Sequence, residues 1–411
     1  MANYEFDLLI VGCGPAGCTL ALHMAAKGYR IGMIEKEKFP RHKICGDALS
    51  GKVLNVMKRI PGNAWADFIR QTDKIPSLGI RFTAPNSHSV DVPFSTISEA
   101  LQHPPGYVCK RSDFDQFMFE RLRNHSNIRL FEGEAIEQVL TLEDHVLART
   151  PNHELRGQVI AGADGVQSVV RRSLVKGPNA AKKHICIGIR GYYEQVSGLH
   201  PENYIELIFL KRLLPGYFWI FPSTGGLANV GFGMLQDRIS GQRENLIHVM
   251  NEIIASDPLI APRFTHAKLA GRQEAHALPL ASHRMDRSGN RFLLLGDAAF
   301  LVDPFSGEGI GNAMASGEIA AEILGQKFPG NDFSATSLRA YDERLNKRFS
   351  REFRTMTIMQ RLAGSPGLFN FVVDKARKNS DIRDLLSAMF TNGDKMAKLT
   401  RPGFYLQLLF K

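Results

Sequence analysis

The N-terminal residues alternate between apolar runs and a stretch rich in small residues, in an order typical of a βαβ unit. Residues 6–11 are apolar except for one aspartate, which predicts a buried strand. Residues 15–27 are rich in alanine and have a helical pattern that Gly28 ends. Residues 30–34 form a second apolar run, which ends at Glu35. The pattern therefore predicts strand, helix and strand in succession.

The rest of the chain mixes strand and helix patterns. Strand patterns, the first of them typical of a hairpin, occupy residues 78–93, 128–163, 184–236 and 291–297. Helical patterns occupy residues 112–124, 243–255, 307–325 and 335–411, the last with breaks at Gly364, Pro366, Gly393 and Pro402. The α/β segments are separated by a β-rich insertion, so we expect two interleaved domains followed by a helical region.

The composition excludes several classes of protein. The 411 residues, 44% hydrophobic and 22% charged, predict two to three globular domains and exclude wholesale disorder. No apolar stretch is long enough to span a bilayer, and the N-terminus lacks the basic region of a signal peptide. Five cysteines without a CxxC pair, and histidines without metal-ligand spacing, predict a cytoplasmic protein without disulfides or a metal site.

Positive charge is concentrated near the C-terminus. Residues 339–411 contain 15 Lys and Arg against 7 Asp and Glu, which contributes +8 of the net charge of +10. Together with the apolar segments 366–373 and 402–410, this charge suits peripheral contact with an anionic membrane. A solvated helical face is the alternative. Nucleic acid is a poorer partner, because the aromatic residues here are mixed with aliphatic ones.

The turn after the first strand has the sequence GxGxxG, from Gly12 to Gly17. Gly12 permits the tight turn, Gly14 lets the backbone approach a pyrophosphate, and Gly17 allows close helix–strand packing. The following helix N-terminus favours an anion. Glu35 lies 18 residues after Gly17, near the position expected for a carboxylate that binds a ribose. This context predicts a dinucleotide site rather than a plain glycine-rich turn.

Two further motifs end strands. Residues 162–171 (GADGVQSVVR) end one strand in Asp-Gly, and Ser168 is also suited to be an ordinary helix N-cap. Gly296 and Asp297 end another strand, and residues 303–312 (DPFSGEGIGN) then lead into a helix. A carboxylate at a strand end can accept a hydrogen bond from a sugar hydroxyl, and a glycine-rich helix start offers N–H donors. Close helix packing would also explain those glycines.

The three motifs in this order resemble the FAD-binding fingerprints of the flavoprotein superfamily with the p-hydroxybenzoate hydroxylase fold. Two further segments resemble the geranylgeranyl reductase family: residues 39–48 (FPRHKICGDA) and residues 215–222 (PGYFWIFP), the second containing YxWxFP. The resemblance covers most of residues 5–325. It implies that Arg111 lies near the FAD phosphates, Asp297 near the ribityl chain, and Cys45 near the flavin.

The resemblance implies these cofactor-binding residues: Gly12, Gly14, Pro15, Ala16, Gly17, Glu35, Lys36, Arg41, Cys45, Gly46, Arg111, Ala163, Asp164, Gly165, Gly296, Asp297, Pro304, Gly307, Gly309, Ile310, Gly311 and Asn312. It implies an α/β fold with a discontinuous Rossmann-type FAD-binding domain at residues 1–75, 105–180 and 271–330. A β-sheet substrate-binding domain is then expected at 76–104 and 181–270, and a C-terminal helical region at 331–411.

The candidate catalytic residues are Cys45, Tyr217 and Trp219. Tyr217, Trp219 and Phe221 alternate along a strand and so share one face, which suits an apolar cavity for a prenyl chain. Core packing is the alternative for this face. Cys45 is a candidate for chemistry if neighbouring basic side chains lower its thiol pKa, or else packs beside the flavin or in the core.

The resemblance implies reduction of carbon–carbon double bonds in an isoprenoid lipid, with FAD as cofactor and NAD(P)H as electron donor. A second GxGxxG for a nicotinamide domain is absent from the sequence. An aromatic or polyketide monooxygenase of the same fold is the main rival, since fold does not fix function. A halogenase fits less well, because YFWIFP departs from the WxWxIP of halogenases. A non-catalytic flavin-binding redox sensor is the alternative outside enzymes.

Overall fold

The computed structural model describes residues 2–94, 104–177, 180–242 and 245–391. Strand β1 (Ala2–Val11), helix α1 (Pro15–Ala25) and strand β2 (Ile31–Glu35) form the predicted βαβ unit. The two strands are parallel, with Leu8 opposite Ile31 and Val11 opposite Ile34. Every residue of β2 is buried, as expected for a strand with both faces covered.

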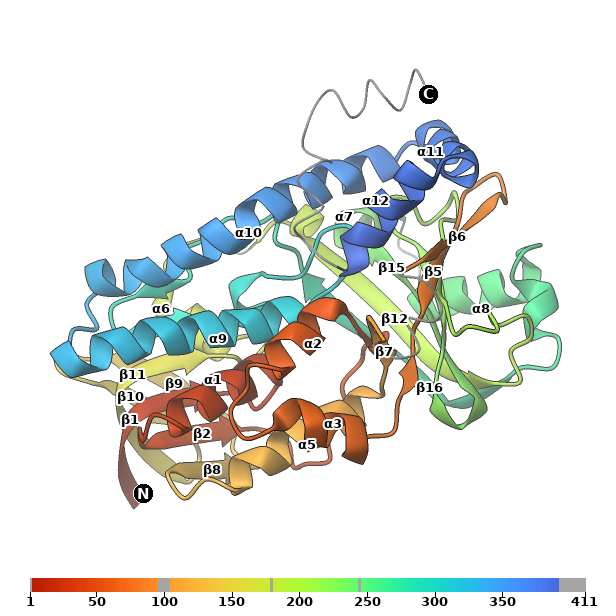
Figure 1. Cartoon of the computed structure of the whole chain (residues 1–411). Helices are drawn as coiled ribbons and strands as arrows, with labels where there is room; N and C mark the ends of the chain where they lie inside the picture. The colour runs from red at the N-terminus through yellow and green to blue at the C-terminus, as the bar shows by residue number, and fades with distance from the viewer. Residues whose placement is uncertain (1, 95–103, 178–179, 243–244, 392–411) are drawn as a thin grey trace.

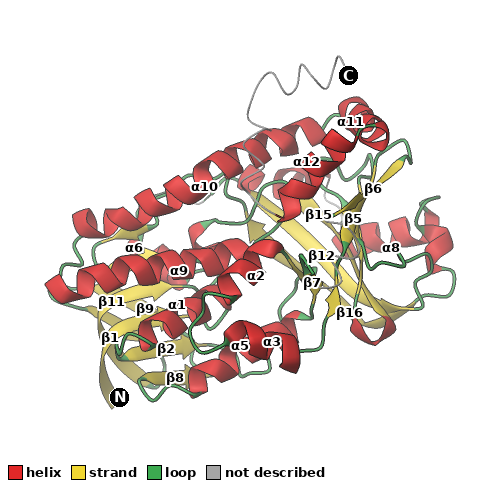
Figure 2. Ribbon diagram, viewed as in Figure 1, coloured by secondary structure: helices red, strands yellow, loops and turns green. Residues whose placement is uncertain are grey.

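The unit belongs to a mostly parallel sheet with the order β17-β18-β11-β1-β2-β8 in the described part of the chain. An antiparallel pair, β9 and β10, continues from β11. Helix α1 packs against α5 and α9, which cover one face of the sheet (Figure 2). The other elements of this part are β8 (Ile128–Glu132), β9 (Gln138–Thr141), β10 (Val146–Arg149), β11 (His153–Gly162), β17 (Ser288–Gly289), β18 (Phe292–Leu294), α5 (Arg111–Arg123), α6 (Val169–Leu174) and α9 (Ile310–Lys327).

A second sheet has the order β16-β12-β15-β14-β13-β5-β6 and is mostly antiparallel. The predicted hairpin at 78–93 is confirmed as β5 and β6, which join this sheet beside β13. Its strands are β5 (Gly79–Thr83), β6 (Ser89–Pro93), β12 (Ile185–Glu194), β13 (Ile205–Ile208), β14 (Phe218–Pro222), β15 (Leu227–Leu235) and β16 (Lys268–Pro279). Because β16 pairs with β12 up to Pro279, we propose that the substrate-binding unit continues past residue 271 to that point.

Short elements connect the two sheets. Strand β7 (Tyr107–Val108) pairs with both β3 (Ala48–Leu49) and β4 (Ile75–Pro76), and the helices α2 (Gly51–Met57) and α3 (Ala64–Gln71) lie in the same part of the chain. Helices α7 (Gln236–Gln242) and α8 (Leu246–Ser256) pack on the second sheet. Turns of 3₁₀ helix are η1 (Lys182–His184), η2 (Thr224–Gly226), η3 (Ala261–Phe264), η4 (Gly296–Ala299) and η5 (Phe328–Gly330). The strand predicted at 291–297 is therefore shorter than expected, because η4 begins at Gly296.

The helical region predicted after residue 335 consists of α10 (Ala335–Ala363), α11 (Pro366–Lys378) and α12 (Ser380–Thr391). Helix α10 contacts α9 and β17 of the parallel-sheet part and leads into α11 beside β6, so it runs along both sheets (Figure 1). The predicted breaks at Gly364 and Pro366 are confirmed. The breaks at Gly393 and Pro402 and the segment 402–410 lie outside the described residues.

Candidate functional site

The glycine-rich turn between β1 and α1 is packed too tightly for side chains at two of its positions. Gly12 has φ of +99°, and a Cβ there would lie 2.4 Å from the carbonyl oxygen of Ala163. A Cβ on Gly17 would lie 2.0 Å from the carbonyl oxygen of Gly12. The atom nearest to a Cβ on Gly14 is Arg41 Nη2, at 3.5 Å. The turn therefore leaves Gly14 open to a close backbone approach, as a pyrophosphate requires.

Glu35 is the last residue of β2, and its side chain contacts the backbone of the glycine-rich turn. Its carboxylate accepts the backbone N–H of Cys13 over 2.8 Å and that of Glu37 over 3.0 Å. The side chain is buried, and Arg41 Nε lies 3.9 Å from its Oε2 atom. The predicted carboxylate therefore stands at the turn, with a structural role there; its contact with a ribose stays a prediction.

Two arginines share one buried carboxylate next to the turn. Arg111, the first residue of α5, donates two parallel hydrogen bonds of 2.8 Å to Asp115. Arg41 Nη2 lies 3.0 Å from the same carboxylate. Arg41 Nε is buried and has no hydrogen-bond partner among the described residues. A buried guanidinium N–H without a hydrogen-bond partner, beside Gly14 and the N-terminus of α1, fits a phosphate of FAD.

The Asp-Gly motif after β11 braces the turn. Asp164 Oδ2 accepts the backbone N–H groups of Val169 (2.7 Å) and Val170 (3.2 Å) and so caps α6. Its Oδ1 is buried without a hydrogen-bond partner in the described part of the chain. Arg171 donates to the carbonyl of Ala298 over 2.9 Å, which joins this motif to the Gly-Asp motif. Gly165 has φ of +79°, which suits glycine.

The Gly-Asp motif and the glycine-rich segment behind it face each other. The N–H of Gly296 donates to Ser316 of α9 over 3.1 Å. A Cβ on Gly309 would lie 3.7 Å from Asp297 Oδ1, so a side chain there would narrow the space beside this half-buried carboxylate. We call residues 303–312 the flavin loop, after the resemblance that predicts their role. Asn312 Nδ2 donates to the carbonyls of Leu301 and Glu308 and so fixes the start of α9. Pro304 and Ile310 are buried in this segment.

The segment around Cys45 lies on the aromatic face of β14. A Cβ on Gly46 would lie 3.0 Å from the ring of Phe221 and 3.9 Å from Trp219 Nε1. Asn229 of the neighbouring β15 donates to the Cys45 carbonyl and to the Asp47 carboxylate, both over 2.8 Å. The two segments that resemble the reductase family, far apart in the sequence, are therefore in contact.

The Cys45 thiol has no activated character. Burial raises its pKa, and the nearby Arg111 offsets this only in part. The condition set for a reactive Cys45, a thiol pKa lowered by basic neighbours, is therefore not met, because loss of hydration outweighs the charge of Arg111. Cys45 holds its proton at neutral pH.

Tyr217 connects the aromatic face to the flavin loop. Its hydroxyl donates to the carbonyl of Ser306, and burial raises its pKa. The Tyr217 and Trp219 ring centroids lie 6.2 Å apart, and Trp219 and Phe221 have the same separation. The predicted shared face is confirmed, and the three rings belong to an apolar cluster with Phe209, Phe305 and Phe369.

The structure also brings together residues that the sequence analysis did not select. Lys43 Nζ donates to His276 Nε2 of β16 over 2.6 Å. Burial lowers the pKa of Lys43, while burial and the adjacent Lys43 lower the pKa of His276 to about 4. Asp47, just before β3, accepts hydrogen bonds from Tyr192 of β12 and Asn229 of β15, both in the second sheet. One predicted residue lies apart: the Lys36 side chain is 70% exposed and pairs with Glu37.

Among these additional residues, Asp115 is the one that a sequence pattern could have indicated. It lies four residues after Arg111 on the predicted helix, which is the spacing of an intrahelical ion pair. The other partners pair across more than 100 positions of the chain, so only the fold reveals them.

Comparison with known proteins gives four matches. Residues 5–350 match the family described as the FAD binding domain. A protein of Methanopyrus kandleri named digeranylgeranylglycerophospholipid reductase 2 is 27% identical over 362 residues, covering 85% of this chain and 84% of that protein. A geranylgeranyl bacteriochlorophyll reductase-like protein of Thermoplasma acidophilum has a TM-score of 0.81 at 22% identity, covering 97% of this chain and 99% of that one. A flavin-dependent brominase has a TM-score of 0.76 at 20% identity, covering 99% and 100%. The two structural likenesses concern the fold.

Proposed function

Because the chain belongs to the FAD-binding-domain family, with residues 5–350 matching it, we propose that it is an FAD-dependent reductase of carbon–carbon double bonds in a geranylgeranyl or longer polyprenyl lipid. Relatives named digeranylgeranylglycerophospholipid reductase match over most of both chains, which supports this substrate class. Reduction rather than oxygen insertion is the chemistry that such names describe.

The observation that carries the proposal is the contact between the aromatic face and the Cys45–Gly46 segment. Tyr217, Trp219 and Phe221 belong to an apolar cluster at the flavin loop, where Tyr217 donates to Ser306. Apolar rings of this kind suit an isoprenoid chain, which has no polar group to pair. An isolated alkene is a poor hydride acceptor, so orientation against the cofactor matters most.

The residues of the site would hold the cofactor and orient the substrate against it. When bound, FAD supplies the electron pair that reduces the double bond. Arg41 and the turn at Gly14 would hold its pyrophosphate, and Asp297 and the flavin loop would hold the ribityl chain and the ring. Cys45 and Tyr217 keep their protons at neutral pH because burial raises both pKa values. Trp219, held by Asn229 over 3.0 Å, presents a fixed apolar surface.

We propose NAD(P)H as the electron donor, on the ground that flavoproteins of this fold are reduced without a second nucleotide-binding domain. Mixing the oxidised holoprotein with NADH or NADPH without oxygen tests this, through bleaching of the flavin absorption. A flavin that stays oxidised with both nucleotides would contradict it and point to another donor.

We also propose peripheral contact with an anionic membrane through α11. Its Leu368 is 38% exposed and its Phe371 is 36% exposed, and its last turn carries Lys375, Arg377 and Lys378. Among the described residues, no helix is long and apolar enough to cross a membrane. We expect the wild type to co-sediment with anionic vesicles at low salt but not with neutral vesicles, and F371D to lose co-sedimentation with the anionic vesicles. Equal sedimentation of wild type and F371D would contradict it.

Product analysis tests the reductase proposal. The holoprotein is reduced under anaerobic conditions and mixed with geranylgeranyl glycerophospholipids and prenyl quinones, and the products are measured by mass spectrometry. A second arm repeats the reaction in air. We expect two added hydrogens per reduced double bond, without oxygen. Oxygen-dependent incorporation of one oxygen atom would replace the proposal with a monooxygenase. Reduction of no acceptor in either arm would favour a flavin-binding sensor.

A further inference from the structure

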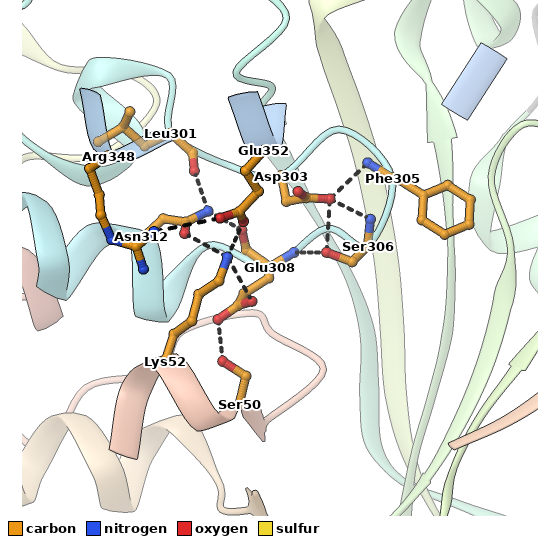
Figure 3. Close-up of polar contacts among 10 residues, drawn as sticks. All are labelled: Ser50, Lys52, Leu301, Asp303, Phe305, Ser306, Glu308, Asn312, Arg348 and Glu352. Atoms are coloured by element: carbon orange, nitrogen blue, oxygen red, sulfur yellow. Dashed lines mark hydrogen bonds and ion pairs between the residues drawn. The ribbon is translucent and has the colours of Figure 1, made fainter. Parts of the chain in front are cut away.

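A largely buried lysine, its side chain 13% exposed, joins the flavin loop to the C-terminal helices. Lys52, in the first turn of α2, donates to Glu352 of α10 and to Asn312 Oδ1 of α9, the second bond being 3.3 Å long. Its Nζ also lies 3.6 Å from Glu308 Oε2 of the flavin loop. Figure 3 shows these side chains converging on the ammonium group. We call Lys52, Glu308, Asn312 and Glu352 the Lys52 cluster.

Each partner in the cluster is itself held. Ser50 donates to Glu308, and Arg348, one turn before Glu352, lies 3.8 Å from the Glu352 carboxylate. The carboxylate of Glu352 is only 8% exposed, whereas Arg348 is 47% exposed at the outer end of the cluster. A glutamate buried on the inner side of a surface helix, pointing at a lysine, is costly unless that pairing is kept.

Carboxylates outnumber the single ammonium group around Lys52. Burial lowers the pKa of Lys52, but Glu308 and Glu352 outweigh it and hold the pKa above its usual value. Asp303, also in the flavin loop, is a third carboxylate near the ammonium, and burial raises its pKa to about 6. Replacing Lys52 or one of these carboxylates therefore changes the electrostatic potential at the flavin loop and also removes a contact that holds the loop in place.

The flavin loop needs an outside support. It contains Gly307, Gly309 and Gly311, and Gly307 has φ of +73°, so its backbone is free in the absence of contacts. Its internal support is Asp303, whose Oδ1 accepts the N–H groups of Phe305 (3.0 Å) and Ser306 (2.7 Å). The Lys52 cluster fixes the other end of the loop, at Glu308 and Asn312.

We propose that Lys52 and Glu352 are positioning residues for the flavin: together they hold residues 303–312 in the cofactor-binding form, which makes α10 part of the cofactor site. The inference rests on the proposed placement of the flavin at this loop. It goes beyond that proposal because it assigns a cofactor role to a helix outside the sequence motifs.

The test compares E352Q and K52M with E343Q, which removes a carboxylate from the exposed face of the same helix (Glu343 side chain 73% exposed). FAD is titrated into each apoprotein, and the midpoint potential of the bound flavin is measured. We expect E352Q to weaken FAD binding by about tenfold and K52M by more, and E343Q by less than about twofold.

The potentials separate a positioning role from a general loss of stability. Removing a carboxylate favours the electron-rich reduced flavin, and removing an ammonium disfavours it. We therefore expect the potential to rise in E352Q and to fall in K52M, with no change in E343Q. If K52M does not fold, E352Q with its control carries the test alone.

Two outcomes are decisive. If E352Q lowers the melting temperature but leaves both the FAD affinity and the potential at the wild-type values, the inference is overturned. Failure of the proposed function would show separately, as a wild-type holoprotein that does not reduce prenyl lipids. Shifts in FAD affinity and flavin potential in E352Q and K52M would still support the role of Lys52 and Glu352 in that case.

Discussion

Trp219 and Asn229 are linked by a hydrogen bond of 3.0 Å from the indole Nε1 to the side-chain oxygen. The amide nitrogen of the same Asn229 donates to the Cys45 carbonyl and to Asp47. One buried amide thus joins the aromatic strand to the segment expected beside the flavin. Asn229 therefore fixes the position of the Trp219 indole relative to the Cys45 segment.

Replacing Asn229 with alanine removes this link. The indole N–H and the Cys45 carbonyl would lose their partners, and we expect a loss of about 3 kcal/mol in the free energy of unfolding. Chemical denaturation measures it. The control N55A changes an exposed asparagine of α2, and a change within about 0.5 kcal/mol is expected there. Equal stability of N229A and wild type would show that the hydrogen bonds contribute nothing.

Substitutions at Gly17 and Gly14 of the turn are predicted to have different outcomes. In G17A the new Cβ would meet the Gly12 carbonyl at 2.0 Å, so we expect loss of folded protein. In G14A the nearest atom is 3.5 Å away, so the apoprotein should fold normally while FAD affinity falls by about tenfold or more. Melting temperature and FAD titration measure the two effects.

Gly330 provides the control for these substitutions. A Cβ there meets nothing within 4 Å, so G330A should match the wild type in both measurements. FAD affinity of G14A equal to that of G330A would argue against a pyrophosphate at this turn.

Cys45 is predicted to react slowly with alkylating reagents. Burial raises the pKa of its thiol despite the nearby Arg111, and only the thiolate is nucleophilic. Iodoacetamide at neutral pH, followed by peptide mass spectrometry, should leave Cys45 largely unmodified in the folded protein and modify it fully in denaturant. Rapid modification of the folded protein at neutral pH would instead indicate a thiolate.

The raised pKa of Asp303 predicts that the free energy of unfolding falls as pH rises. Burial raises its folded pKa to about 6, whereas the unfolded value is 3.8. Between these values the folded state binds more protons than the unfolded state, so raising the pH through this window destabilises the fold. The full difference corresponds to about 3 kcal/mol.

The variant D303N isolates this effect, because asparagine resembles the protonated acid and does not titrate. We expect the free energy of unfolding of the wild type, relative to D303N, to decrease between about pH 4 and pH 7. A difference between the two proteins that stays constant over this range would show that folding does not raise the pKa of Asp303.

The local parts of the site could be predicted from the sequence. The turn from Gly12 to Gly17 and the end of β2 at Glu35 follow from periodicity and spacing, because a βαβ unit brings them together within 24 residues. The alternation of Tyr217, Trp219 and Phe221 placed the three rings on one face for the same reason.

The pairings between distant segments could not be predicted. Lys52 contacts Glu352 across 300 positions of the chain, and Asn229 contacts Cys45 across 184. No local pattern in the sequence indicates such long-range contacts. The thiol pKa of Cys45 could not be predicted for a related reason: its neighbours in sequence are basic, yet the dominant effect on the pKa is burial. Spatial environment, rather than local composition, decides such properties.

The central claim, that electrons pass from the reduced flavin to a prenyl double bond, is tested most directly by an anaerobic single-turnover measurement. Chemically reduced holoprotein in deuterated buffer is mixed with a geranylgeranyl glycerophospholipid while the flavin absorption is followed. The account predicts that the oxidised absorption returns in proportion to lipid reduced, with deuterium added across the double bond. A flavin that stays reduced until air is admitted, with the lipid unchanged, would contradict it.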